Sequence, residues 1–205
     1  MRLVAGGIPE LEVGDPEPEP TRLPKQFETG FRAHNTNVFP QRPDRAYIGY
    51  IDGGAFVLDI SDKSNIKVVS KWNHSPPFNG FIHTVLPLFD RGLWIVSDEC
   101  VLDNGADWPK LVRVLDARQE GNPAPIGTFP APSYKAFAKR GGRFWAHNLH
   151  ENLPGPCSFV SDHIIIGTFF NAGVRVYDTT NPLRLRRLLA MFPAPLSCAH
   201  LEQFN

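Results

Sequence analysis

A layout of about fifty residues recurs along the chain, and it constrains the fold more than any other feature. In each copy a short apolar strand ends in aspartate, a polar turn follows, and another strand leads away, as in "AFVLDISDKSNIKVVSKW". The aspartates are Asp59, Asp116 and Asp178, which are 57 and 62 residues apart. Because a carboxylate at the end of a strand can accept hydrogen bonds from backbone N–H groups of the next turn, we expect each aspartate to cap its turn.

A histidine recurs in phase with these aspartates. Each copy opens with a histidine behind a small or apolar pair, in "FRAHNTNVF", "GFIHTVLPL", "FWAHNLHEN" and "LSCAHLEQF". The four residues are His34, His83, His147 and His200, at spacings of 49, 64 and 53. A period near fifty residues, with about four short strands in each copy, is typical of β-propeller blades.

The strand pattern agrees with this reading. Ten short runs rich in β-branched and aromatic residues are bounded by Gly, Pro and Asn, which predicts strands. They cover 45–51, 55–60, 66–72, 83–89, 92–98, 111–117, 124–130, 163–169, 173–179 and 186–192. Helical periodicity is weak, and 135–140 predicts a turn or two of helix at most. We therefore predict an all-β fold; a β-sandwich with accidental internal similarity is the alternative to a propeller.

The repeats also predict where the blades lie. We expect an extended proline-rich lead-in at 1–30, four-stranded blades at 31–77, 80–132 and 144–195, and the start of a further blade at 197–205. About three and a half blades do not close a ring, because propellers typically have about four to eight. The prediction is therefore part of a larger propeller, completed by a missing chain segment or by a second copy. An open propeller would leave unpaired strand edges.

Composition narrows the classes of partner. Lys+Arg and Asp+Glu are both 21, so the formal net charge is zero and neither nucleic acid nor an anionic membrane is an expected partner. No run of about 18 apolar residues predicts a membrane span, and the N-terminal stretch does not resemble a signal peptide. The 3 cysteines are widely spaced, which indicates a reducing compartment. We expect a cytoplasmic protein with small-molecule or protein partners.

Several of these segments resemble the LVIVD-repeat family. They are "RAYIGYIDGGAFVLDISD", "HTVLPL" followed by "LWIVSDE", "HNLHEN", and "FFNAGVRVYDTTNP", and the resemblance covers about residues 31–205. It implies a β-propeller with more blades than this chain supplies, and it implies a fold more readily than a reaction. The chain departs from the family in being short at its C-terminal end and in lacking a secretion signal.

The repeated histidines suggest a metal site. The first strand of each propeller blade lines the central channel, so His34, His83, His147 and His200 would converge around the axis. Neutral imidazole is the commonest protein ligand for ions such as zinc, copper, iron and nickel, which predicts a bound divalent transition metal. In the alternative, these histidines are structural and hydrogen-bond the backbone of the neighbouring blade.

Three further residues are candidates for catalysis. His150 and Glu151 occur in the third copy alone, and Glu99 lies beside an insertion, 101–110, that could form a lid carrying Trp108. A glutamate can orient a ligand histidine or act as a general base. In the alternative for "HNLHEN", Glu151 and its neighbouring asparagines satisfy the backbone of a turn.

Two functions follow from these candidates. The first is an axial site that binds a metal ion or a small ligand, in an enzyme of unknown reaction whose chemistry is metal-assisted. The second is a non-catalytic propeller scaffold whose rim binds another protein. The sequence has no GxSxG, P-loop, HExxH or zinc-finger spacing, so several common enzyme classes lose support.

Overall fold

The computed structural model describes residues 31–78 and 80–192 and contains three antiparallel sheets. The first is formed by β1 (Asn35–Phe39), β2 (Arg42–Gly49), β3 (Ala55–Asp59) and β4 (Lys67–Trp72). The second is formed by β5 (Ile82–Leu88), β6 (Leu93–Asp98), β7 (Val112–Asp116) and β8 (Ala124–Thr128). The third is formed by β9 (Ile164–Thr168), β10 (Val174–Asp178) and β11 (Arg186–Met191). Within each sheet neighbouring strands follow chain order, which makes the fold all-β.

The helical elements are short and lie between strands. They are η1 (Phe89–Arg91), η2 (Asp103–Gly105), α2 (Tyr134–Phe137), η3 (Ala138–Arg140) and η4 (Phe170–Ala172). The stretch at 135–140, for which the sequence predicts a turn or two of helix, is occupied by α2 and η3. No helix in the described ranges is both long enough and apolar enough to cross a membrane.

A fourth extended segment pairs with the three-stranded sheet. The N–H groups of His147 and His150 donate to the carbonyls of Thr168 and Ile166, at 3.1 and 2.9 Å. The N–H of Thr168 donates back to Asn148 at 2.8 Å, and Leu149 bridges to Gly167. Each predicted blade range therefore contains four extended segments in chain order, although the first segment of the third range is irregular.

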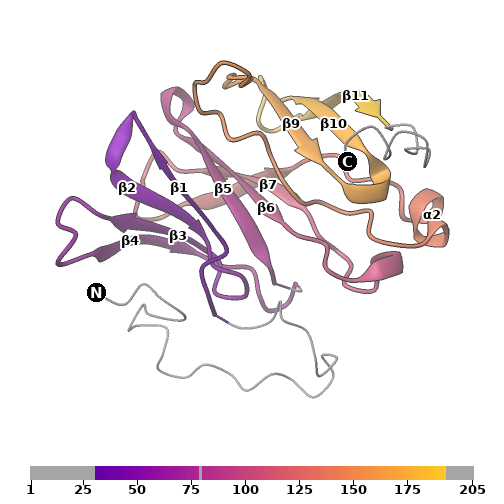
Figure 1. Ribbon diagram of the computed structural model, residues 1–205, viewed down its shortest axis with the longest axis horizontal. Helices are drawn as coiled ribbons and strands as arrows, with labels where there is room; N and C mark the ends of the chain where they lie inside the picture. Colours follow the sequence, from indigo (N-terminus) through magenta and orange to yellow (C-terminus); the bar gives the residue numbers. More distant parts are fainter. Residues whose placement is uncertain (1–30, 79, 193–205) are drawn as a thin grey trace, which may run out of the picture.

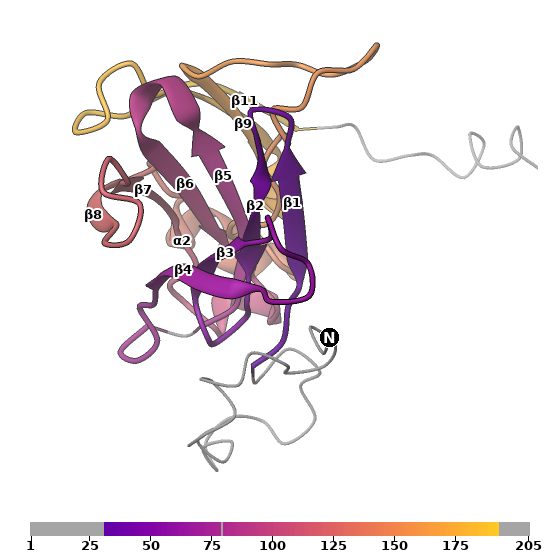
Figure 2. The same ribbon diagram turned by 90° about the vertical axis from the view of Figure 1, so that its left-hand side faces the viewer.

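The middle sheet carries much of the core. In Figure 1 the β1–β4 and β9–β11 sheets lie on either side of the β5–β8 sheet. Every residue of β5 and β6 is buried, because neighbours cover both faces of these strands. One hydrophobic cluster joins all three sheets, with members that include Tyr47, Val57, Leu86, Ile95, Ile165 and Tyr177. Figure 2 shows β1 and β2 standing beside β5.

The aspartates at the strand ends cap their turns, as the repeat predicts. Oδ1 of Asp59 accepts from the N–H of Ser61 at 2.9 Å, Oδ1 of Asp116 from Arg118 at 3.1 Å, and Oδ1 of Asp178 from Thr180 at 2.9 Å. A hydrogen bond from the side chain of the same donor residue, Ser61, Arg118 or Thr180, has the larger effect on the carboxyl pKa. Together these bonds lower the pKa of all three carboxyls, and the pKa of Asp116 and of Asp178 to about 2.

The ten predicted strands are all present, with bounds that differ by at most three residues. β1 is the one described strand that was not among them. Its sequence, "NTNVF", is polar, and its burial alternates because successive side chains point to opposite faces of the sheet. It pairs with β2 alone, at the edge of the sheet. The predicted lead-in at 1–30 and the predicted start of a further blade at 197–205 lie outside the described residues.

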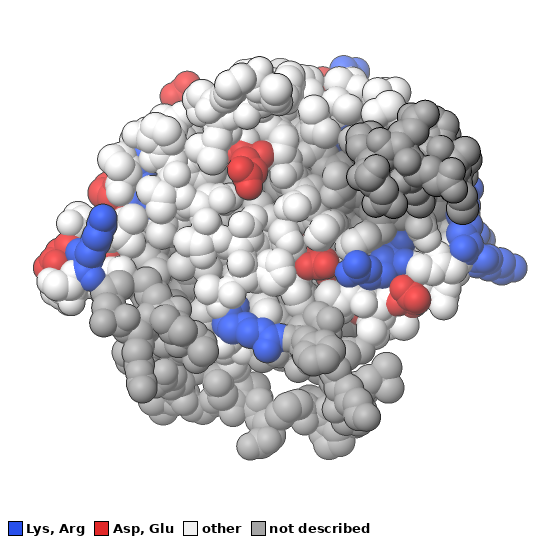
Figure 3. Space-filling model, in the orientation of Figure 1, with Lys and Arg blue, Asp and Glu red and all other residues white. Residues whose placement is uncertain are grey.

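Charge is spread thinly over the face of the molecule shown in Figure 3. Acidic and basic side chains stand singly or in small mixed groups, and most of the visible described surface is uncharged. This face therefore presents no extended patch of one sign among the residues described.

Candidate metal site

Three of the four repeat-initial histidines converge on one carboxylate, that of Glu99. Oε2 of Glu99 lies 3.8 Å from Nε2 of His34 and 3.7 Å from Nε2 of His83. Its other oxygen, Oε1, lies 3.6 Å from Nε2 of His147. These four residues are called the histidine cluster below. His200, the fourth repeat-initial histidine, lies outside the described residues.

Backbone hydrogen bonds explain why residues so far apart in sequence meet here. Glu99 follows β6, and its N–H donates to the carbonyl of Phe81 at 2.9 Å, just before β5. The next N–H, of Cys100, donates to Ala146 at 2.8 Å, just before His147. The end of β6 is thus held between the starts of the second and third repeats. Each of those starts carries its repeat-initial histidine.

Asp98 and Glu99 serve different places, although they are adjacent in the chain. Successive side chains of an extended strand point to opposite faces. Asp98 is fully buried and accepts a hydrogen bond from Nη1 of Arg113 at 2.8 Å, away from the histidine cluster. Of the two acidic residues, Glu99 alone therefore faces the histidines.

The imidazole rings form a row with a phenylalanine at each end. The ring centroids of His34 and His83 are 4.4 Å apart, and those of His83 and His147 are 4.9 Å apart. Phe81 lies 5.1 Å from His34, and Phe170 stacks on His147 at 4.6 Å. Both phenylalanines have positive φ, 69° and 46°. A bulky residue in this conformation is strained, and such strain tends to gather at functional sites.

Burial keeps the three histidines neutral. It lowers the pKa of His83 to about 3, assisted by the neighbouring His34 and His147. Burial also lowers the pKa of His34, together with Arg32, and that of His147, together with Arg143. A neutral imidazole keeps the lone pair that a metal ion needs, so all three histidines are ready to act as ligands near neutral pH.

The histidine cluster is buried on one side and open on the other. The side chains of His83 and Glu99 are 6% and 10% exposed, whereas those of His34 and His147 are 37% and 31% exposed. A small molecule can therefore approach past His34 and His147 while His83 and Glu99 stay fixed by their surroundings.

A second layer of polar groups orients His83. Its Nδ1 lies 2.6 Å from the hydroxyl oxygen of Thr84, and that hydroxyl accepts a hydrogen bond from the side-chain amide of Asn35 at 3.1 Å. This contact leaves Nε2 of His83 directed at Glu99. Metal-binding histidines usually carry such a partner on the nitrogen that does not bind the metal.

His34, His83 and Glu99 lie close enough together to hold one metal ion. One ligand atom from each of His34, His83 and Glu99 lies within 4.8 Å of the others. Metal–ligand bonds of about 2.1 Å in a tetrahedral site place ligand atoms about 3.4 Å apart, close to the 3.7 and 3.8 Å found here. Two imidazoles and one carboxylate are the ligand set of many catalytic zinc sites and of non-haem iron(II) sites.

His150 makes its contacts outside the histidine cluster. Nδ1 of His150 accepts a hydrogen bond from the N–H of Ile166 at 3.1 Å, and its ring lies 5.5 Å from that of Phe159. Glu151 is exposed. His147 and His150 are three positions apart in an extended segment, so their side chains point to opposite faces. The structure thus places His150 against β9 rather than in the histidine cluster.

Two residues of the site were not singled out from the sequence. Nη1 of Arg143 donates to Oε1 of Glu99 at 3.1 Å and to the carbonyl of Cys100 at 3.3 Å. Thr84 is the other. The sequence signal for Thr84 was its position directly after His83. The signal for Arg143 was its position four residues before His147, directly before the segment "FWAHNLHEN".

The insertion at 101–110 packs beside the site as an ordered loop. Asp107 accepts hydrogen bonds from the N–H groups of Val101 and Leu102, at 2.7 and 3.3 Å. The N–H of Asn104 donates to Gly142 at 2.9 Å, which ties the loop to the chain just before Arg143. Trp108, the residue expected on a lid, is 56% exposed.

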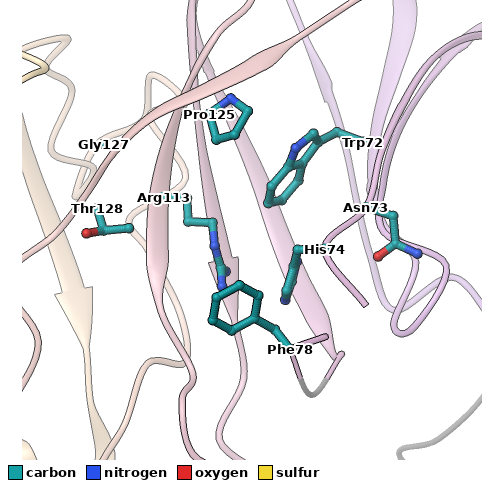
Figure 4. Close-up of a pocket in the computed structure, with 8 residues that line it drawn as sticks. All are labelled: Trp72, Asn73, His74, Phe78, Arg113, Pro125, Gly127 and Thr128. Carbon is teal, nitrogen blue, oxygen red and sulfur yellow. The ribbon is translucent and has the colours of Figure 1, made fainter. Parts of the chain in front are cut away.

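A separate pocket of about 400 Å³ lies between the end of β4 and strands β7 and β8 (Figure 4). His74 stacks on Trp72 at 5.3 Å, and the guanidinium of Arg113 lies 5.1 Å from the Phe78 ring. Both His74 ring nitrogens and Nη2 of Arg113 are shielded from solvent and have no hydrogen-bond partner within the described part of the chain. The lining of this pocket combines three aromatic rings with Arg113, whereas the histidine cluster gathers three imidazoles on one carboxylate and is the better candidate for chemistry.

Comparisons with known proteins add no identification. No protein-family model matches the chain, and no curated protein proved similar to it. The candidate site therefore rests on the geometry of its own residues.

Proposed function

We propose that this protein binds a divalent transition metal ion through His34, His83 and Glu99, with His147 at the open edge of the site. The observation that carries the proposal is the convergence of three neutral imidazoles on one largely buried carboxylate. A bound ion would supply a Lewis acid that polarises a water molecule or a substrate oxygen. The solvent-facing side of the histidine cluster leaves room for such a ligand, as catalytic metal sites require.

In this proposal Glu99 is a metal ligand and not the proton acceptor that the sequence suggested. Its Oε2 is the atom nearest to both His34 and His83. Its Oε1 already accepts from Arg143 at 3.1 Å, which holds the carboxylate in place. The protein would then be a metal-dependent enzyme in which Glu99 holds the ion and does not serve as the general base.

Zinc titration of the purified protein, followed by calorimetry, tests the proposal. We expect one zinc ion per chain in the wild type, and loss of binding in His83→Ala and in Glu99→Gln. His163→Ala is the matched control, because His163 is an exposed histidine in the bend before β9. Circular dichroism verifies that each variant is folded. Equal zinc binding in the wild type and in folded His83→Ala, or none in the wild type, would refute the metal site.

We further propose that the three sheets are blades of a β-propeller of the LVIVD type that continues beyond the third sheet. The fifty-residue period, the chain-order sheets and the meeting of equivalent histidines support it. So does the outer face of the third sheet, where β9 and β10 turn Ile166 and Val176 outward and β11 adds Leu189 and Met191, 52% and 55% exposed. An apolar face of this kind marks an interface.

This outer face also supports the second candidate function, a scaffold that binds another protein. The same apolar residues would serve a further blade of the propeller, a second copy of the chain or an unrelated partner. The metal titration separates the two functions, since a pure scaffold has no use for metal at the histidine cluster.

A further inference from the structure

We infer that the proposed metal site takes a ligand with a carboxylate group, held by Arg143 beside the ion. The inference rests on the proposed metal binding and names the chemical class of ligand for that site. Arg143 reaches the site from the chain segment before His147, and its role is to bind the ligand rather than the metal.

One edge of the Arg143 guanidinium is anchored and the other is available. Nη1 donates to Oε1 of Glu99 at 3.1 Å and to the carbonyl of Cys100 at 3.3 Å. The side chain is 38% exposed, and Nε and Nη2 make no hydrogen bond within the described ranges. Nε and Nη2 of this partly exposed side chain therefore remain as donors next to the carboxylate on which the histidines converge.

The guanidinium also packs on an aromatic ring, which limits the conformational freedom that Arg143 loses when a ligand binds. It lies 3.9 Å from the centre of the Phe170 ring, and that ring stacks on His147 with an angle of 15° between planes. The N–H of Asn171 donates to the carbonyl of Arg143 at 3.0 Å, which fixes the backbone. A preorganised planar fork of this kind is suited to bidentate recognition of a carboxylate.

Charge favours an anion at this place. Near neutral pH the three histidines are uncharged, and the charges of Glu99 and Arg143 cancel. A divalent ion would leave two positive charges in a partly buried site, and Arg32 adds a further positive charge near His34. A ligand carboxylate would reduce this excess. A planar carboxylate can accept from both donor nitrogens of the open edge of Arg143 at once.

Cobalt(II)-loaded protein, titrated with glycolate, tests the inference. Glycolate is a small probe that offers a carboxylate to Arg143 and a hydroxyl to the metal. We expect saturable binding, seen in the visible cobalt spectrum and by calorimetry. Arg143→Gln should weaken it at least about tenfold, as loss of a charge-assisted contact does. Arg143→Lys should restore part of the affinity, because it keeps the charge and loses the fork.

Arg140→Gln is the matched control, since Arg140 is exposed and also lies over a phenylalanine ring, that of Phe137, at 4.4 Å. It should bind glycolate like the wild type. Absence of cobalt binding in the wild type would overturn the metal site and this inference with it. Normal cobalt binding with equal glycolate affinity in the wild type and Arg143→Gln would overturn the inference alone. Tighter binding of inorganic phosphate than of glycolate would overturn the carboxylate assignment.

Discussion

At the scale of single residues, an equivalent position in the repeat predicted the members of the histidine cluster better than closeness in sequence did. His34, His83 and His147 are about fifty residues apart and meet, because equivalent positions of successive repeats face the same place. His150 is three positions from His147 and faces elsewhere, because side chains alternate along an extended segment. Glu151 follows the paired segment and is exposed. Arg143 could not have been found in this way, since its contact with Glu99 depends on how two repeats pack together.

The contact between Thr84 and His83 leads to a prediction about metal affinity. Thr84→Val keeps the shape of a buried side chain but removes the oxygen that lies 2.6 Å from Nδ1 of His83. Loss of such an orienting partner typically weakens metal binding about 10- to 100-fold. Zinc calorimetry measures the change, with Thr128→Val in β8 as the control. An unchanged zinc affinity in Thr84→Val would show that this contact does not orient the ligand.

The buried His74 leads to a prediction about how the free energy of unfolding depends on pH. Burial, with smaller contributions from Arg113 and Lys110, lowers its pKa from 6.5 to about 3, while Asp52 acts in the opposite direction and Asp98 lies 3.4 Å away. As the pH falls below 6.5 the unfolded chain takes up a proton at His74 and the folded chain does not, down to about pH 3. The free energy of unfolding therefore falls by about 1.4 kcal/mol per pH unit for this group.

The matched measurement compares wild type and His74→Gln by urea denaturation at about pH 7 and about pH 5. The other buried histidines contribute equally to both proteins. The wild type should therefore lose about 2 kcal/mol more than the variant between the two pH values. Equal losses in the two proteins would mean that His74 takes up its proton in the folded state.

At the scale of elements, local sequence predicted most of what the structure contains. The ten predicted strands combine β-branched and aromatic residues with clear turn signals, and the three aspartates at strand ends cap their turns as expected. β1 escaped prediction because "NTNVF" is polar, and its place in the sheet comes from pairing with β2 rather than from its own preference. The irregular segment 147–150 is defined in the same way by its pairing with β9.

The burial of the middle sheet predicts where substitutions matter most. Ile95 lies at the centre of β6 and is fully buried, so Ile95→Ala should lower the free energy of unfolding by about 2–5 kcal/mol through lost burial and an unfilled cavity. Leu183→Ala, on a 75% exposed side chain in the turn before β11, is the control and should change it little. Urea denaturation at neutral pH measures both. Similar costs at the two positions would contradict the position of β6 in the core.

At the scale of the whole molecule, the period of the sequence predicted the number and chain order of the sheets in the described residues. The period does not predict what covers the outer face of the third sheet, because the covering surface is not part of the three sheets. The middle and third sheets differ clearly in burial. β5 and β6 are covered on both faces, whereas β11 is exposed along most of its length and carries apolar side chains there.

This contrast predicts association through the third sheet. On β11, Leu189 pairs with Val176 of β10 and Met191 pairs with Val174 of β10, which forms a continuous apolar strip. Substituting both Leu189 and Met191 would disrupt this strip. We expect the wild type to be larger in solution than a 22.9 kDa monomer, and Leu189→Glu with Met191→Glu to be monomeric, by light scattering after size exclusion. Leu183→Glu is the control, because Leu183 is 75% exposed in the turn before β11, outside the strip. A monomeric, well-folded wild type would contradict self-association, and the apolar strip would then have to serve a different partner.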